Sequence, residues 1–88
     1  MEVIAGVAAK QDALVRFSDE SSPLQLEIKS VVSGLFGKAL RSAAEAELTR
    51  QNVTRGRILI EDNQALDFVI RARIQAAVLA MREAGGDV

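Results

Sequence analysis

Two periodicities follow each other in the middle of the chain, and together they restrict the fold class. Apolar and polar residues alternate without a break from Leu24 to Lys29, which predicts a strand with one buried face. Ser30 can then cap a helix that runs to about Gln51. Its expected apolar stripe is Val32, Leu35, Phe36, Ala39, Leu40 and Ala43. A chain that changes period within a few residues is expected to pack helices on a sheet.

Further strands are expected on both sides of this unit. Residues 3–9 and 13–17 are short apolar runs separated by three polar residues, so we expect a β-hairpin with its tip at residues 10–12. The serine-rich segment 18–23 is expected to be an exposed connection, because small polar side chains and a proline favour turns. Residues 58–60 are three consecutive apolar residues, which predict a strand covered on both faces.

A second helix is expected in the last third of the chain. Asp62 and Asn63 are candidate caps, and Asn52 and Gly85 are candidate stops for the first and second helices. Asp67 and Arg71 are four residues apart and can pair on the solvent side. The predicted apolar stripe comprises Leu66, Val69, Ile70, Ile74, Ala77, Val78 and Met81.

The predicted order is β-β-β-α-β-α. Two apolar helices can bury against the same strand residues, so we predict an α+β two-layer sandwich with both helices on one face of a small mixed sheet. With 88 residues there is room for one hydrophobic core, and residues 1–88 are expected to form a single domain. No segment is long and apolar enough to cross a membrane, and no signal peptide is recognisable, so we expect a cytoplasmic protein.

The composition excludes several kinds of chemistry. The chain has no Cys and no His, which removes thiolate nucleophiles, imidazole bases and the usual transition-metal ligands. It has no Trp or Tyr to stack on bases, and a net charge of -1 gives no general attraction to nucleic acid or anionic lipid. We therefore expect no metal site, no nucleic-acid or membrane partner, and no catalysis by this chain alone.

Three local features each allow a functional and a structural interpretation. Gly34 and Gly37 have the spacing of an RNA-clamping GxxG loop, but they lie within a helical stripe, where glycine can instead allow close packing. The acidic serine segment 18–22 could be a modification or metal loop, or simply a connection. Five arginines could form a docking rim or be solvated charges, with the stem of the last one covering the core: Arg50, Arg55, Arg57, Arg71 and Arg73.

Motifs along nearly the whole chain resemble one family, the citrate lyase gamma subunit or acyl carrier protein. Residues 62–77 are similar to its signature Asp-x-Gly-Ala-Leu-Asp followed by Ala-Arg, and residues 36–41 to its Phe-Gly-x-Ala-Ile-Arg. Asn52 and Val53 match its Asn-Val pair. The N-terminal hairpin matches the family at Ala5, Gly6, Asp12 and Arg16.

The resemblance implies a small non-catalytic subunit of a citrate-lyase-type complex. In this family a serine carries a phosphoribosyl dephospho-coenzyme A group through a phosphodiester, and the thiol of that group carries acyl groups between an alpha-like acyltransferase subunit and a beta-like lyase subunit. Tethering of this kind raises the effective concentration of the thioester at each active site. Because the cofactor supplies the sulfur, a chain without Cys or His suits the task.

The chain departs from the family at the attachment position. The resemblance places Lys10 where the prosthetic-group serine is expected, and an amine cannot form the phosphodiester. The chain could have lost the arm and serve as a docking subunit, could carry the arm on another hydroxyl such as Ser18, or could hold a substitution at this site. A lysine at a hairpin tip could also imitate biotinyl or lipoyl lysine, although Ala9 and Gln11 match neither signature. The hydroxy-acid that the complex cleaves stays open.

Overall fold

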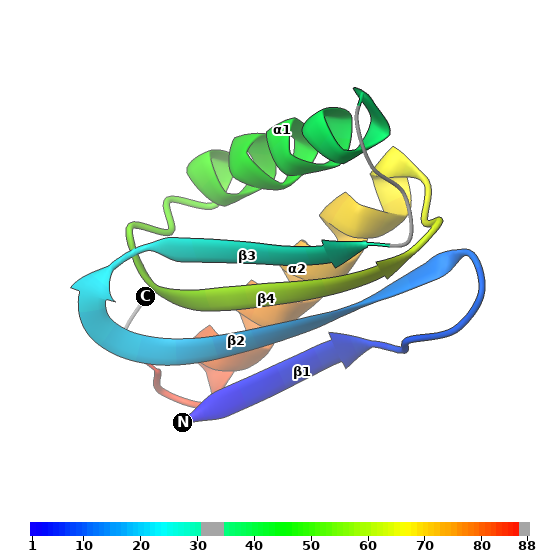
Figure 1. The fold of residues 1–88 in the computed structure, drawn as a ribbon. Helices are drawn as coiled ribbons and strands as arrows, with labels where there is room; N and C mark the ends of the chain where they lie inside the picture. The colour runs from blue at the N-terminus through cyan, green and yellow to red at the C-terminus, as the bar shows by residue number, and fades with distance from the viewer. Residues whose placement is uncertain (31–34, 87–88) are drawn as a thin grey trace.

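A computed structural model describes residues 1–30 and 35–86. Its elements follow the predicted order β-β-β-α-β-α (Figure 1). They are β1 (Glu2–Gly6), β2 (Asp12–Pro23), β3 (Gln25–Ser30), α1 (Leu35–Arg50), β4 (Arg55–Asn63) and α2 (Asp67–Glu83).

The four strands form one mixed sheet in the order β1-β2-β4-β3. β1 pairs antiparallel with β2, β2 pairs antiparallel with β4, and β3 runs parallel to β4. Ile58 of β4 lies opposite Phe17 on one side and Leu26 on the other. The strand that comes last in the sequence therefore lies inside the sheet, and β1 and β3 form its edges (Figure 1).

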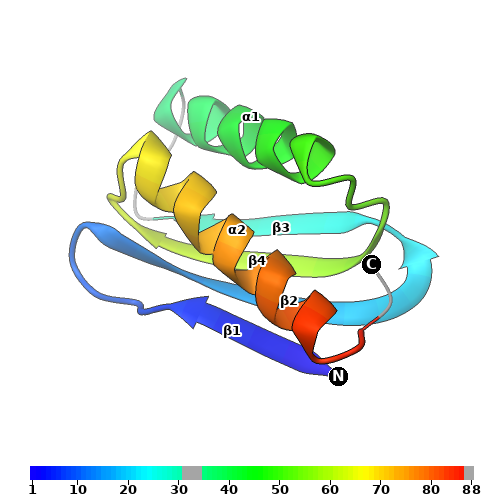
Figure 2. The ribbon, with the colours of Figure 1, turned by 180° about the vertical axis from the view of Figure 1, so that it is seen from behind.

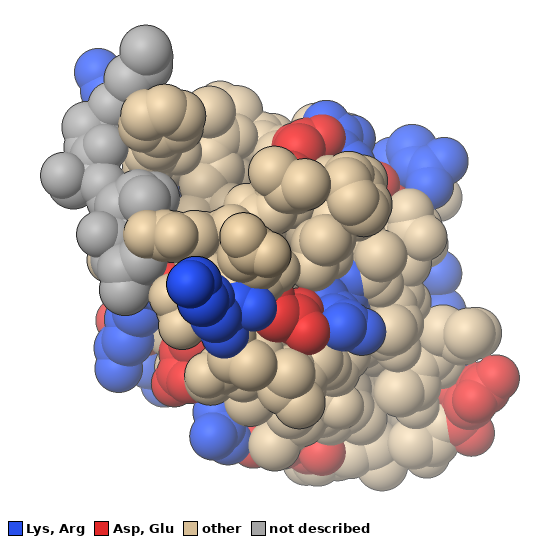
Figure 3. All heavy atoms as spheres, turned by 90° about the vertical axis from the view of Figure 1, so that its right-hand side faces the viewer, with Lys and Arg blue, Asp and Glu red and all other residues tan. Residues whose placement is uncertain are grey.

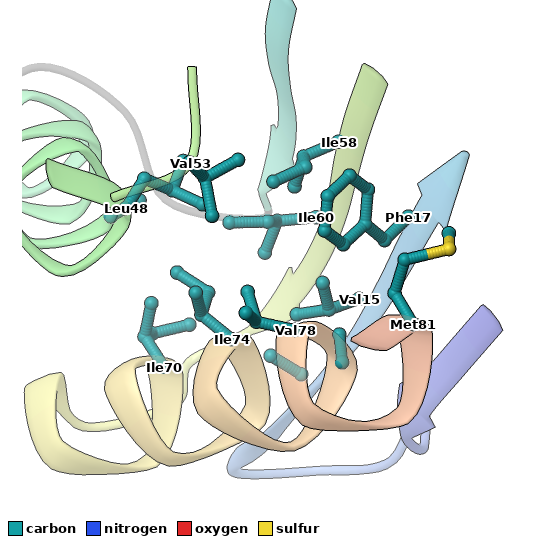
Figure 4. Close-up of a cluster of buried hydrophobic side chains, with 13 residues drawn as sticks. Val15, Phe17, Leu48, Val53, Ile58, Ile60, Ile70, Ile74, Val78 and Met81 are labelled. Atoms are coloured by element: carbon teal, nitrogen blue, oxygen red, sulfur yellow. The ribbon is translucent and has the colours of Figure 1, made fainter. Parts of the chain in front are cut away.

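Both helices cover the same face of the sheet, which confirms the predicted α+β sandwich (Figure 2). α2 packs across β1 and β2, while α1 packs mainly against α2 on the side of β3. In the core, α2 side chains point toward the strand residues Val15, Phe17, Ile58 and Ile60 (Figure 4). The α2 residues buried there are Ile70, Ile74, Ala77, Val78 and Met81.

Two segments differ from the strand prediction. Residues 18–23 belong to β2 and do not form a connection; the pairing with β4 shifts register between Ser18 and Pro23, and Pro23 lies opposite Arg55. Ser18 pairs with Glu2 of β1 and Arg57 of β4, the amide of Asp19 donates to the carbonyl of Met1 at 3.2 Å, and Pro23 pairs with Arg55, so pairing in the sheet outweighs the local preference for a turn. Residues 7–9, predicted as strand, leave the sheet because β1 ends at Gly6, whose φ is 83°.

β4 and the start of α2 also differ from the prediction. Ile58 and Ile60 are buried, but Leu59 is half-buried on the outer face, because both helices lie on the opposite face and leave this one uncovered. Asp62 does not cap α2: β4 continues to Asn63, and the helix begins at Asp67 after Leu66, which has no side-chain capping bond.

The predicted helix ends are confirmed. Asn52 has a left-handed φ of 59° just after α1, and Gly85 has a φ of 82° just after α2. At the other end of α1, the expected cap by Ser30 concerns amides at residues 31–34, which lie outside the described residues. Ser30 itself is the last residue of β3, and its hydroxyl donates a hydrogen bond to Asp62 Oδ2 at 2.7 Å.

Candidate functional site

The hairpin tip between β1 and β2 is formed by residues 7–11, and we use the name "tip" for these five residues. Lys10 is exposed near its end, and Gln11 has a left-handed φ of 62°. The backbone amide of Asp12 donates to the carbonyl of Ala9 at 3.0 Å and closes the turn. The tip therefore projects from one end of the sheet (Figure 1).

The base of the tip is joined to α2 by an ion pair. Arg73 Nε donates to Asp12 Oδ1 at 3.0 Å, and Arg73 Nη2 donates to Asp12 Oδ2 at 2.8 Å. The backbone amide of Ala13 also donates to Asp12 Oδ1, at 2.7 Å. The hydrogen bond from Arg73 is the main cause that lowers the pKa of Asp12, and the bond from Ala13 is the next. The hydrogen bond to Asp12 and the charge of Asp12 raise the pKa of Arg73. Asp12 is thus held as a carboxylate with both oxygens engaged.

Gly6 leaves room for this ion pair. A Cβ built at Gly6 would overlap the carbonyl oxygen of Ala13 and approach Arg73 Cδ to 2.8 Å. The stem of Arg73 therefore passes directly over Gly6. A side chain at position 6 would displace it, and the positive φ of Gly6 adds a second reason for glycine there.

The turn between β4 and α2 lies beside the tip. The amide of Gln11 donates to the carbonyl of Asn63 at 2.7 Å, which connects the two segments. Asp62 is buried and accepts a bond from the amide of Ala65 at 2.9 Å, in addition to the bond from Ser30. Gln64 has a φ of 62°, and it occupies the place where the family signature has glycine.

Next to this turn is an apolar hollow of about 390 Å³. It is lined by Phe36, Ala39, Leu40, Asp62, Gln64, Ala65, Leu66 and Asp67. Phe36 is 73% exposed and Leu66 is 62% exposed, so the rim of the hollow is an apolar surface. Uncharged side chains cover much of this end of the molecule (Figure 3).

The structure separates the other residues that the sequence singled out. Gly34 lies outside the described residues. At Gly37, an added Cβ would meet no described atom within 4 Å, so the interpretation that this glycine allows close packing is wrong. Ser18 lies opposite Glu2, at the far end of the β1–β2 ladder from the tip, and its hydroxyl donates to Glu2 at 3.4 Å. Within residues 1–30 and 35–86, no group of three or more acidic side chains is placed to hold a metal ion.

Among the described residues, acidic partners are seen for four arginines of the possible docking rim, Arg50, Arg57, Arg71 and Arg73. Arg71 Nε pairs with Asp67 Oδ2 at 2.9 Å, as predicted. The other pairs are Arg50 with Glu47, Arg57 with Glu27, and Arg73 with Asp12. The interpretation of these side chains as balanced charges is therefore the better one for these four.

Glu47 of α1 is a buried residue that the sequence analysis missed. Its carboxylate accepts hydrogen bonds from Gln51 at 2.8 Å and from Gln75 of α2 at 3.2 Å, and Arg50 Nη2 lies 3.3 Å away. Burial raises the pKa of Glu47, but the hydrogen bonds from Gln51, Arg50 and Gln75 outweigh burial and hold it below its ordinary value. The only signal in the sequence is the helical spacing from Ala43 and Ala44, which places Glu47 on the inward face.

Comparisons with known proteins agree over nearly the whole length. A family profile described as "Malonate decarboxylase delta subunit (MdcD)" matches residues 1–81. The citrate lyase acyl carrier protein of Cronobacter sakazakii is 41% identical over 94% of this chain and 86% of its own length. Those of Escherichia fergusonii and Klebsiella pneumoniae are 36% and 35% identical, over 93% and 90% of this chain and 86% and 82% of their own lengths. No solved structure gives a significant match.

In the described residues, neither helix is long and apolar enough to span a bilayer.

Proposed function

Since the chain belongs to the family of citrate lyase acyl carrier proteins and malonate decarboxylase delta subunits, we propose that it is a small acyl-carrier-type subunit of a citrate-lyase-type complex. Residues 1–88 act as one domain in the cytoplasm, without catalysing a reaction alone. The domain positions CoA-type thioesters between an alpha-like acyltransferase subunit and a beta-like lyase subunit. The observation that carries this proposal is the exposed tip, braced at its base by Asp12 and Arg73.

The family's covalent arm, phosphoribosyl dephospho-coenzyme A, does not fit the tip as it stands. A phosphodiester to the protein needs a hydroxyl, and residues 7–11 are Val7, Ala8, Ala9, Lys10 and Gln11, which offer an amine and an amide. Ser18 is no substitute: it is six strand residues beyond Asp12, about 20 Å away at the usual rise per residue. We therefore assign no phosphodiester to Lys10, although it occupies the expected attachment position.

A second candidate function follows from this misfit. The chain would be a docking subunit without a covalent arm, in a related complex whose other subunits use free CoA thioesters. The donor set of the tip favours this candidate, and the braced geometry serves it equally well, because a fixed tip can dock into a partner with or without a cofactor.

Intact mass of the native chain decides between the two candidates. The chain is produced with the other subunits and the maturation enzymes of its own complex, and the complex is purified through a partner subunit. A coenzyme-sized mass increase supports a carrier. An unmodified 9.5 kDa chain that still co-purifies supports the docking subunit, and failure to co-purify contradicts both.

Lys10→Ser tests the placement of the attachment position, with Lys38→Ser on α1 as the matched control. Both lysines are exposed, so neither substitution should disturb the fold. We expect only Lys10→Ser to gain the coenzyme-sized adduct. A folded Lys10→Ser chain that co-purifies but stays unmodified would show that the attachment position is not at the tip.

A further inference from the structure

The tip has little packing of its own to hold it in one orientation. Val7, Ala8, Ala9 and Lys10 are all exposed, and Val7 is exposed over 54% of its surface. Two backbone hydrogen bonds, from Gln11 and from Asp12, close its second half. A short loop with so little buried surface samples several orientations unless its ends are fixed.

The residues on either side of the tip meet the same side chain. Gly6, just before the tip, lies under the stem of Arg73, since a Cβ there would be 2.8 Å from Arg73 Cδ. Asp12, just after the tip, accepts both hydrogen bonds from the Arg73 guanidinium. One residue of α2, 61 positions away along the chain, therefore contacts the strand before the tip and the strand after it.

Arg73 is itself held firmly. Its neighbour Ile74 is fully buried, and Ile70, four residues before Ile74, and Ala77, three residues after it, are buried on the same face of α2. A guanidinium has a planar arrangement of donors that matches a carboxylate at two points, which sets direction as well as distance. The amide of Ala13 fixes the same carboxylate from the strand side.

We propose that Asp12 and Arg73 are positioning residues, which fix the direction in which the tip leaves the sheet and so the direction in which it meets a partner subunit. Gly6 is required because a Cβ there would overlap the carbonyl oxygen of Ala13 and its φ is positive, and the lack of a side chain also leaves room for the Arg73 stem. The positioning itself depends only on this chain; its use rests on the proposed function, in which the tip is the part presented to partners.

Hydrogen exchange of the full-length chain tests the positioning directly. In Arg73→Ala, the amides of Gln11 and Asp12 should exchange about tenfold faster or more, because they report closure of the tip, while the amides of Val15 and Ile60 in the sheet stay within about twofold. Arg71→Ala is the matched control: it removes an arginine two residues away on α2 that pairs with Asp67 instead. It should leave the tip unchanged.

Conservative variants separate positioning from folding. Arg73→Lys keeps the charge but loses the two-point contact, so its tip exchange should fall between wild type and Arg73→Ala. If Arg73→Ala does not fold, Arg73→Lys and Asp12→Asn carry the test. Tip exchange within about twofold of wild type in these variants, or equal acceleration in Arg71→Ala, would overturn the proposal.

The Lys10→Ser chain adds a functional readout. Combining it with Arg73→Lys should slow the attachment of the coenzyme group by the maturation enzyme, while combining it with Arg71→Ala should not. If Lys10→Ser alone is never modified, the proposed attachment position fails, and the hydrogen-exchange result still decides whether Asp12 and Arg73 position the tip.

Discussion

The two helices lie on the same face of the sheet but are held there by different interactions. α2 buries five apolar residues against the strands. Among its described side chains, α1 buries Ala43, Ala44, Leu48 and the carboxylate of Glu47, and it contacts mainly α2. The comparison indicates that hydrophobic burial fixes α2. In contrast, α1 depends in addition on the polar cluster of Glu47, Arg50, Gln51 and Gln75, whose strength varies with pH.

Ile74→Ala should have the largest effect, because it opens a cavity where α2 meets the sheet. Ile74 is fully buried, and we expect a loss of about 2–5 kcal/mol in the free energy of unfolding, measured by urea denaturation. Leu79→Ala is the control on the same helix; Leu79 is 58% exposed, and its loss should be under about 0.5 kcal/mol. Equal losses for the two variants would contradict the proposed anchoring of α2.

Glu47→Ala should come next. It removes the acceptor for Gln51, Gln75 and Arg50, and we expect a loss of about 1–3 kcal/mol by the same measurement. Glu45→Ala is the control: Glu45 is exposed and pairs with Arg41 at 3.6 Å, so its loss should be under about 1 kcal/mol. If Glu45→Ala is as costly as Glu47→Ala, the polar cluster does not hold α1.

Lowering the pH should weaken the hydrogen bonds and ion pairs made by the carboxylates of Glu47 and Asp12. The pKa of Glu47 is lowered in the folded chain, so its contribution is complete above the ordinary value of 4.5 and is lost as the pH falls through the lower folded value. Asp12 behaves in the same way from its ordinary value of 3.8. The free energy of unfolding should therefore decrease from pH 5 to pH 3.

The variant Glu47→Gln isolates the contribution of α1 to this acid sensitivity. Position 47 no longer titrates in this variant, so its free energy of unfolding should decrease less steeply with acid than that of wild type. Parallel curves for the two chains, obtained from urea titrations at each pH, would show that Glu47 has the same pKa folded and unfolded.

Asp67→Asn should have the smallest effect. Asp67 and Arg71 form an exposed pair four residues apart in the first turns of α2, worth about 0.3–0.5 kcal/mol. The difference in thermal unfolding midpoint between wild type and Asp67→Asn should also shrink in high salt, because salt screens exposed charges. A loss above about 1 kcal/mol would mean that Asp67 has a role in starting α2 beyond this pair.

The sequence predicted the order of elements and the fold class because each element has its own periodicity. It failed where a neighbour in space decides the outcome. Residues 18–23 have the composition of a turn, yet they belong to β2, because Ser18 pairs with both β1 and β4 and Pro23 pairs again with β4. Asp62 is a residue type that often caps helices, but its carboxylate accepts hydrogen bonds from the Ser30 hydroxyl and the Ala65 amide instead.

The candidate site was predicted in part. The hairpin and the exposed Lys10 follow from local pattern, since three polar residues separate two apolar runs. The partnership of Asp12 with Arg73 does not, because no local pattern links residues 61 positions apart. The left-handed backbone at Gln64 was hidden for a similar reason, since glutamine gives no signal for that conformation.

The central place of β4 has a consequence for how the chain is made. As the chain leaves the ribosome, β1 and β2 can form their hairpin, but β3 has its described sheet partner only in β4. One edge of β2 and the whole of β3 therefore stay unpaired until β4, which ends at Asn63, has been synthesised and can pair with both strands. Such long-range pairing folds slowly, and a nascent chain that ends before β4 leaves apolar strand edges open to aggregation.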